Sequence, residues 1–240
     1  MITCITPTRD RSHIFNEIIE CMNNQTVKPD RWIIVDDGHT PVSDDVLSKS
    51  DIPVKHIIMP KPNPRVKTHT INFRAGAKRV SDEGSIFVID DDDYYAPTYI
   101  EKMMGYLNNG VDIVGTAREI EYSLRKDGGY DILNRARFTT NHHTAFNTKI
   151  LNEVFKVIDN TDDPRMDLLV WDHIKKKTFI KWAMPVFDPY ICVSFKQWPA
   201  IVNGYCKNHR KDFLGNVDKD YKYLKNLLGD DFERYSKYIH

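Results

Sequence analysis

The sequence predicts an α/β fold with a mixed, mainly parallel sheet flanked by helices, in a single domain over residues 1–240. Short apolar segments alternate with segments of helical periodicity through residues 1–110, a pattern typical of parallel strands joined by crossover helices. The length of 240 residues is enough for one full core. The hydrophobic fraction of 41% and the charged fraction of 28% are ordinary for a soluble globular protein.

Four apolar segments of the first half are expected to be strands, at residues 2–5, 32–35, 54–58 and 86–89. Right-handed crossovers place the carboxyl ends of such strands along one edge of the sheet. Carboxylates follow two of these strands, at Asp36 and Asp37 and again at Asp90 to Asp92. We therefore expect these side chains to meet in space despite their separation in sequence.

Helices are expected between these strands. Apolar residues recur at helical spacing over residues 14–22, 71–78 and 100–107. Thr98 and Glu101 match a capping box at the start of the third helix. In the second half we expect strands at 111–116, 119–124, 179–186 and 190–195, and helices at 150–158, 168–177 and 218–228.

The run from Asp90 to Asp93 is the strongest functional signal. Four like charges after a buried strand repel one another unless a cation or hydrogen bonds offset them. In an extended segment, Asp90 and Asp92 point the same way and Asp91 points oppositely, while Asp93 is expected to begin the next loop. Mg²⁺ and Mn²⁺ prefer oxygen ligands. The run therefore predicts a divalent metal that holds a phosphate-bearing substrate.

Asp36-Asp37-Gly38 forms a second acidic strand end. Alone, Asp and Gly at this place are typical of a simple turn. A second carboxylate cluster at the same edge of the sheet favours a ligand site instead, because two converging acidic ends are costly without one.

Several polar residues of the second half are weaker candidates. Adjacent histidines such as His142 and His143 do not easily face one tetrahedral ion, so we expect them to line a pocket or a polar loop. His209 lies in a basic loop and is either a metal ligand or solvated. Asp167 and Asp172 lie five residues apart on a predicted helix and do not share a face, so one of them is the candidate general base.

Charge and composition exclude some classes of protein. Lys plus Arg is 34 and Asp plus Glu is 34, so bulk charge does not favour indiscriminate binding to nucleic acid or membrane surfaces. No apolar run approaches the roughly 18 residues needed to span a bilayer, and no charged leader precedes the first strand. The four cysteines fit neither a zinc knuckle nor a small disulfide framework, so a reducing cytoplasm is expected, the host cytoplasm if the chain is viral.

The chain resembles a GT-A glycosyltransferase of the broad glycosyltransferase family 2. The resemblance covers residues 1–110 well and the remainder loosely. It lies in four segments: residues 5–9, the pair Gln25-Thr26, residues 34–38 and residues 88–93, the last followed by Pro97. It divides the chain into an expected nucleotide-sugar-binding half (1–110) and an acceptor-binding half (111–240).

The resemblance implies a nucleotide-sugar donor, most often a UDP-sugar, and Mn²⁺ or Mg²⁺. The residues it places around the donor are Pro7, Thr8, Arg9, Asp36, Asp37, Arg74, Asp90 and Asp91. Among them, Asp37 is expected to meet the uracil and Asp91 to hold sugar hydroxyls. Asp92, with His209, is the expected metal ligand. The Glu-Asp pair usual on the later helix is absent; Met166-Asp167 is the nearest match, with Asp172 second, and the implied transfer inverts configuration.

The acceptor stays open between two classes. One is a glycan or lipid-linked glycan. The other is a hydroxymethylated base of viral DNA, which would make the chain a phage-type member of the family; basic loops motivate it, and a base would need a pocket, for which His142, His143 and Trp198 are candidates. A third hypothesis is a non-catalytic protein that only binds nucleotide sugars, because the general base is uncertain.

Overall fold

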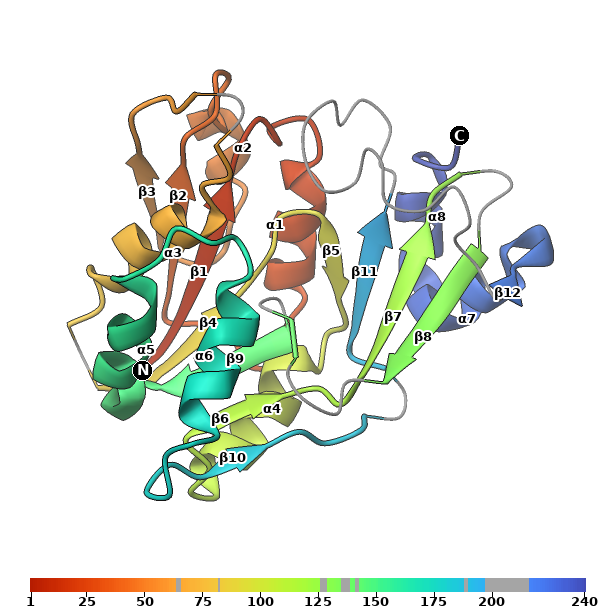
Figure 1. The fold of residues 1–240 in the computed structure, drawn as a ribbon. Coiled ribbons are helices and arrows are strands. Elements are labelled where there is room, and N and C mark those ends of the chain that lie inside the picture. The colour runs from red at the N-terminus through yellow and green to blue at the C-terminus, as the bar shows by residue number, and fades with distance from the viewer. Residues whose placement is uncertain are drawn as a thin grey trace.

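The described strands of the chain form two sheets, seen side by side in Figure 1. The structure, a computed structural model, describes residues 1–63, 66–81, 83–125, 129–134, 139–140, 143–187, 190–196 and 216–240. Within these ranges, no helix is both long enough and apolar enough to cross a bilayer.

The main sheet has seven strands and is mostly parallel. Its order is β10 (Trp182–Ala183), β6 (Ile113–Gly115), β9 (Thr144–Asn147), β4 (Ser85–Val88), β1 (Ile2–Thr8), β2 (Arg31–Asp36) and β3 (Val54–Ile58). The four neighbours β4, β1, β2 and β3 run parallel, and β9 is antiparallel to both of its neighbours. This confirms the predicted mainly parallel sheet and all four strands expected in residues 1–110.

Helices cover both faces of the main sheet (Figure 1). One face packs against α3 (His69–Ala77), α5 (Leu151–Ile158) and α6 (Met166–Ile174), and the other against α1 (Phe15–Asn23) and α4 (Tyr99–Asn108). Alternation along each strand explains this, since successive side chains point to opposite faces. On β2, for example, Ile33 belongs to the core on the α3 side, whereas Trp32 and Ile34 belong to the core on the α1 side.

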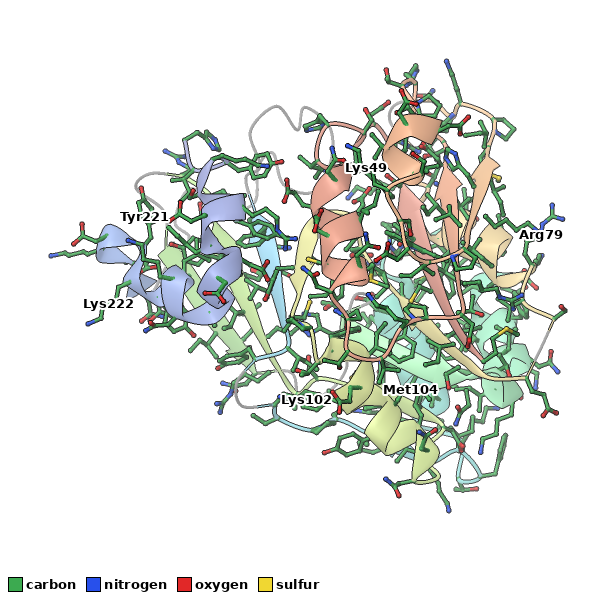
Figure 2. All side chains as sticks on the ribbon, turned by 180° about the vertical axis from the view of Figure 1, so that it is seen from behind. Lys49, Arg79, Lys102, Met104, Tyr221 and Lys222 are labelled. Carbon is green, nitrogen blue, oxygen red and sulfur yellow. The ribbon has the colours of Figure 1, made fainter. Side chains whose placement is uncertain are left out.

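The second sheet was only partly predicted from the sequence. Its order is β12 (Asn216–Val217), β8 (Gly129–Asn134), β7 (Arg118–Ser123), β11 (Cys192–Lys196) and β5 (Asp93–Tyr95). Seen from behind, α7 (Lys222–Leu228) and α8 (Phe232–Ser236) lie over this sheet, with Tyr221 and Lys222 marking where α7 begins (Figure 2). Strands β7 and β11 match expected segments, but β5, β8 and β12 were not expected. Two further elements outside this sheet were not expected either: β9 of the main sheet and the short helix α2 (Asp44–Leu47).

The cap of α4 differs from the predicted capping box. Thr98 makes no side-chain hydrogen bond to the helix. Instead, the side-chain oxygen of Gln25 accepts from the backbone N–H of Ile100 at 3.0 Å, and the Thr26 hydroxyl donates to Glu101 at 2.7 Å. A loop that is distant in sequence therefore caps this helix, which is why local sequence pattern was misleading.

The two halves of the chain share one core. Residues beyond 110 supply β6, β9 and β10 to the main sheet, and Phe146 of β9 packs in the same cluster as Ile5 and Ile33. The expected strand at 179–186 is reduced to the two residues of β10, at the edge of that sheet.

Candidate functional site

The carboxyl ends of β1, β2 and β4 lie at one edge of the main sheet, as the sequence predicts. The loop after β1 connects the acidic ends of the other two strands. Arg9 forms an ion pair with Asp37 after β2, and the Thr8 hydroxyl donates to Asp91 after β4. Residues at the end of β1 therefore connect both acidic clusters, which form one site.

Asp37 is fixed by a dense set of donors. Arg9 binds it in a fork, with Nε 3.0 Å from Oδ1 and Nη2 2.8 Å from Oδ2, and the Thr68 hydroxyl donates to the same carboxylate. The Asp37 side chain is only 2% exposed. Burial alone would raise the pKa of Asp37, but its hydrogen bonds, first those from Arg9 and Thr68, outweigh that effect and hold the pKa below its usual value.

We expect Asp37→Asn to destabilise the fold by about 1–3 kcal/mol at pH 7, because Arg9 loses its charged partner. A carboxylate with a depressed folded-state pKa stabilises the protein above its unfolded pKa and loses that contribution as pH falls through the folded pKa. The difference between wild type and variant should therefore shrink below about pH 4. Urea unfolding at several pH values measures it, and a difference independent of pH would refute the ion-pair explanation.

Asp36 has a structural position beside Asp37. It is buried, and its oxygens accept the backbone N–H groups of Gly38 at 2.8 Å and Val42 at 2.9 Å. A Cβ on Gly38 would lie 2.7 Å from the backbone nitrogen of Asp10, so the close approach of the loops after β1 and β2 requires glycine. We expect Asp36 to hold this turn and so to support Asp37; direct contact with a donor stays a prediction.

The acidic run provides a cluster of oxygen ligands. Asp90, Asp92 and Asp93 each place one carboxylate oxygen within 4.8 Å of the others, while Asp91 turns toward Thr8. The segment is a turn and not an extended strand, and Asp93 begins β5 instead of a loop. An all-carboxylate set suits Mg²⁺ or Mn²⁺, so the residues fit the metal that the sequence predicts.

Arg11, from the loop after β1, lies against this cluster. Its Nη2 is 3.3 Å from Asp92 Oδ2, and its Nε is 4.0 Å from Asp91 Oδ1. Burial raises the pKa of Asp91 to about 7; Arg11 opposes this shift, and the negative charges of Asp92 and Asp90 add to it. The surroundings of Asp91 therefore disfavour its charged form.

His69 joins the site from the start of α3. Its Nε2 lies 3.2 Å from Asp90 Oδ1, and the side chain is about one-quarter exposed (26%). Burial would lower the pKa of His69, but Asp90 and then Asp167 raise it above the ordinary value. The negative charges of the acidic run and of Asp167, a candidate base, therefore both act on this histidine.

The two candidate bases lie at opposite ends of α6. Asp167 is in the first turn, where it lines a small pocket with Val88 and Thr144. Asp172 is in the last turn, and its charge acts on Lys175. Asp167 thus acts electrostatically on His69, which contacts Asp90, whereas Asp172 acts on Lys175; the assignment of the base stays a prediction.

Other predicted residues lie as follows. Pro7 is buried in β1 opposite Val35. Arg74 donates to the carbonyl oxygen of Ile158 and to Asp162, both at 2.6 Å, so its guanidinium connects α3 to the end of α5. His143 is buried, and its Nδ1 lies 2.6 Å from the Thr116 hydroxyl. His142, Trp198 and His209 lie outside the described residues.

Four residues of the site were not predicted to contribute to it: Arg11, Thr68, His69 and Asp93. The sequence offers a signal only for Asp93, which extends the acidic run. Thr68 and His69 begin a helix whose amino end faces the neighbouring strand ends, and this contact depends on how the helix crosses the sheet.

Comparisons with known proteins show the family and the fold of this chain. The sequence profile of Glycosyl transferase family 2 matches residues 3–162. An uncharacterized glycosyltransferase, YwdF of Bacillus subtilis, is 29% identical over 127 residues, which are 53% of this chain and 45% of that protein. The matched region thus covers less than half the length of this curated relative.

Solved structures show a similar fold at low sequence identity. Residues 1–349 of S. aureus TarS in complex with UDP-GlcNAc align with a TM-score of 0.58 and 13% identity, over 97% of this chain and 72% of that one. The mannosyltransferase PcManGT from Pyrobaculum calidifontis, in complex with GDP-Man and Mn²⁺, aligns with a TM-score of 0.56 and 14% identity, over 84% and 58%. Because the family profile matches two-thirds of the sequence, the chain belongs to Glycosyl transferase family 2.

Proposed function

We propose that this chain moves a sugar from a nucleotide sugar, most simply a UDP-sugar, to an acceptor hydroxyl with inversion of configuration. The observation that carries the proposal is the convergence of the Arg9–Asp37 ion pair and the oxygen cluster of Asp90, Asp92 and Asp93 at one sheet edge. Similarity to structures that hold UDP-GlcNAc, or GDP-Man with Mn²⁺, supports it.

The two clusters suggest separate parts of the donor. The cluster of Arg9, Asp37 and Thr68 combines hydrogen-bond donors with a carboxylate, and we place the nucleobase beside it. The diphosphate then lies toward Asp92. Mn²⁺ or Mg²⁺, held by Asp92 with Asp90 and Asp93, would supply positive charge to the leaving diphosphate.

The proposed transfer needs one base. The acceptor oxygen attacks the anomeric carbon and forms the new glycosidic bond, while the bond from that carbon to the diphosphate oxygen breaks and leaves its electron pair on the diphosphate. Asp167 accepts the proton of the acceptor hydroxyl. His69 contacts Asp90, and the charge of Asp167 also acts on it; we assign it the task of holding Asp90 in place.

A panel of nucleotide sugars and nucleoside diphosphates, each with and without Mn²⁺, tests this function by thermal shift. A donor at 100 times its dissociation constant should stabilise the fold by about 2.7 kcal/mol. We expect the shift for one class of nucleotide to require Mn²⁺ and to disappear with EDTA. Absence of any metal-dependent shift across the panel would contradict the proposal.

For the acceptor, we propose a hydroxyl of a glycan or lipid-linked glycan. Transfer to modified DNA would depend on phosphate contacts, and activity would then fall steeply between 50 and about 200 mM salt. We expect transfer that is nearly insensitive to salt in that range; a steep fall would favour the nucleic-acid acceptor.

A further inference from the structure

Arg11 occupies an unusual place for a surface-loop arginine. Its side chain is only 13% exposed, and its guanidinium contacts Asp91 and Asp92 at the same time. Asp92 Oδ2, which Arg11 approaches at 3.3 Å, belongs to the carboxylate that we assign to the divalent ion. Arg11 and a divalent ion are thus two cations directed to one carboxylate.

Hydrogen bonds anchor the backbone on both sides of Arg11. Thr8 and Arg9 are held by Asp91 and Asp37, and the Arg11 carbonyl accepts the N–H of Ile14 at 3.0 Å where the chain turns into α1. A long side chain on a fixed backbone can redirect its charged end by rotation about its own bonds.

The charge of the cluster gives a reason for such a movement. Four carboxylates, Asp90 to Asp93, lie close together beside one guanidinium and one histidine, so carboxylates outnumber these cations in the cluster. A divalent ion would neutralise the excess negative charge, so Arg11 would no longer be required to neutralise Asp92. A guanidinium matches the oxygens of a phosphate as well as those of a carboxylate, because its N–H groups form a planar fork.

We propose that Arg11 is an exchangeable cation of the donor site, paired with Asp92 in the free protein and with the diphosphate once nucleotide and divalent ion are bound. This rests on the proposed function. Arg11 then has two opposing effects. It competes with the ion for Asp92, and it contributes directly to nucleotide binding. A residue that merely shaped the site would support both kinds of binding.

Calorimetric titration separates these possibilities. Mn²⁺ alone is titrated into wild type, Arg11→Gln and Arg11→Lys, and then UDP and GDP are titrated at saturating Mn²⁺. For Arg11→Gln we expect Mn²⁺ to bind about three- to tenfold more tightly, since an ion pair of modest strength is removed. We expect the nucleotide that wild type prefers to bind about ten- to hundredfold more weakly, because a charge-assisted bond to phosphate is lost.

Two further variants serve as controls. Arg79→Gln removes the same charge from an exposed position after α3 (Figure 2) and should change neither affinity. Arg11→Lys keeps the charge without the fork, so Mn²⁺ affinity should stay near that of wild type and nucleotide affinity should be partly restored. If Arg11→Gln unfolds, Arg11→Met removes the same charge with a side chain of similar length, and the same opposite changes in Mn²⁺ and nucleotide affinity are expected of it.

The outcomes are distinct. Affinities for Mn²⁺ and nucleotide that both fall in a folded variant without the Arg11 charge would overturn the exchange, and so would affinities that both stay unchanged. If wild type binds neither UDP nor GDP with Mn²⁺, the proposed function fails, and the role of Arg11 fails with it. If wild type binds one of them, but removing the Arg11 charge does not change Mn²⁺ affinity and nucleotide affinity in opposite directions, the Arg11 proposal alone is overturned.

Discussion

Asp92→Ala should abolish Mn²⁺-dependent binding of the nucleotide donor and lower the transfer rate by about 10³-fold or more. Asp92 lies in the oxygen cluster with Asp90 and Asp93 and is still 17% exposed, so a diphosphate can approach an ion that it holds. Removing a ligand removes charge stabilisation at the leaving group, which is among the largest contributions an active site makes. Calorimetry with nucleotide and Mn²⁺, together with single-turnover rates, measures both effects.

The control for this variant is Asp51→Ala, at an exposed position after α2. It removes the same side chain away from the site and should leave binding and rate unchanged. Metal-dependent binding that survives in folded Asp92→Ala would show that the ion is held elsewhere, and would refute the assignment of the acidic run.

The second large effect is expected for Asp167→Asn. If Asp167 accepts the proton of the acceptor, its amide variant should lose about 10²- to 10⁴-fold in kcat. Nucleotide affinity should stay within about twofold, because Asp167 does not belong to the oxygen cluster of Asp90, Asp92 and Asp93. Steady-state kinetics and calorimetry on the same preparations separate the two quantities.

Asp172→Asn is the matched comparison on the same helix. It makes the same chemical change in the last turn of α6, where Asp172 acts on Lys175. We expect a change of less than about twofold in kcat. The opposite result, with Asp172→Asn inactive and Asp167→Asn active, would transfer the role of base to Asp172.

The sheet edge was predictable from sequence because periodicity and strand-end chemistry are local signals. Strands β1, β2 and β4 are continuous apolar segments, and the right-handed crossover rule then fixes where their acidic ends meet. The predictions that Asp37 and Asp92 lie at this edge needed nothing more. Thr8 and Arg9 were expected there only from the family resemblance, and the structure places them beside Asp91 and Asp37.

The second sheet was harder to predict because its strands lack a clear pattern. Strand β8 mixes apolar and charged residues, and β5 begins with Asp93, a residue type that is unfavourable in strands. β5 forms because its backbone pairs with β11 and the Asp93 carboxylate accepts the N–H of Phe195 at 3.0 Å. The sequence of either segment alone contains no pattern that predicts such pairing.

The contacts of Arg11 and His69 were not predictable for a similar reason. His69 meets Asp90 because the amino end of α3 crosses to the end of β4, and Arg11 meets Asp92 because the loop after β1 folds over that same end. Both depend on tertiary geometry. The capping of α4 by Gln25 is another example, since a long-range side chain replaced the local cap that the sequence favours.

The most direct test of the central claim is donor hydrolysis without acceptor. A glycosyltransferase that activates its donor at the acidic run should slowly release nucleoside diphosphate from its nucleotide sugar, with water as the attacking hydroxyl. We predict release that requires Mn²⁺ or Mg²⁺, stops with EDTA and is lost in Asp92→Ala. No release from any nucleotide sugar that binds, or release unaffected by EDTA, would contradict the account and favour a protein that binds the donor without transferring it.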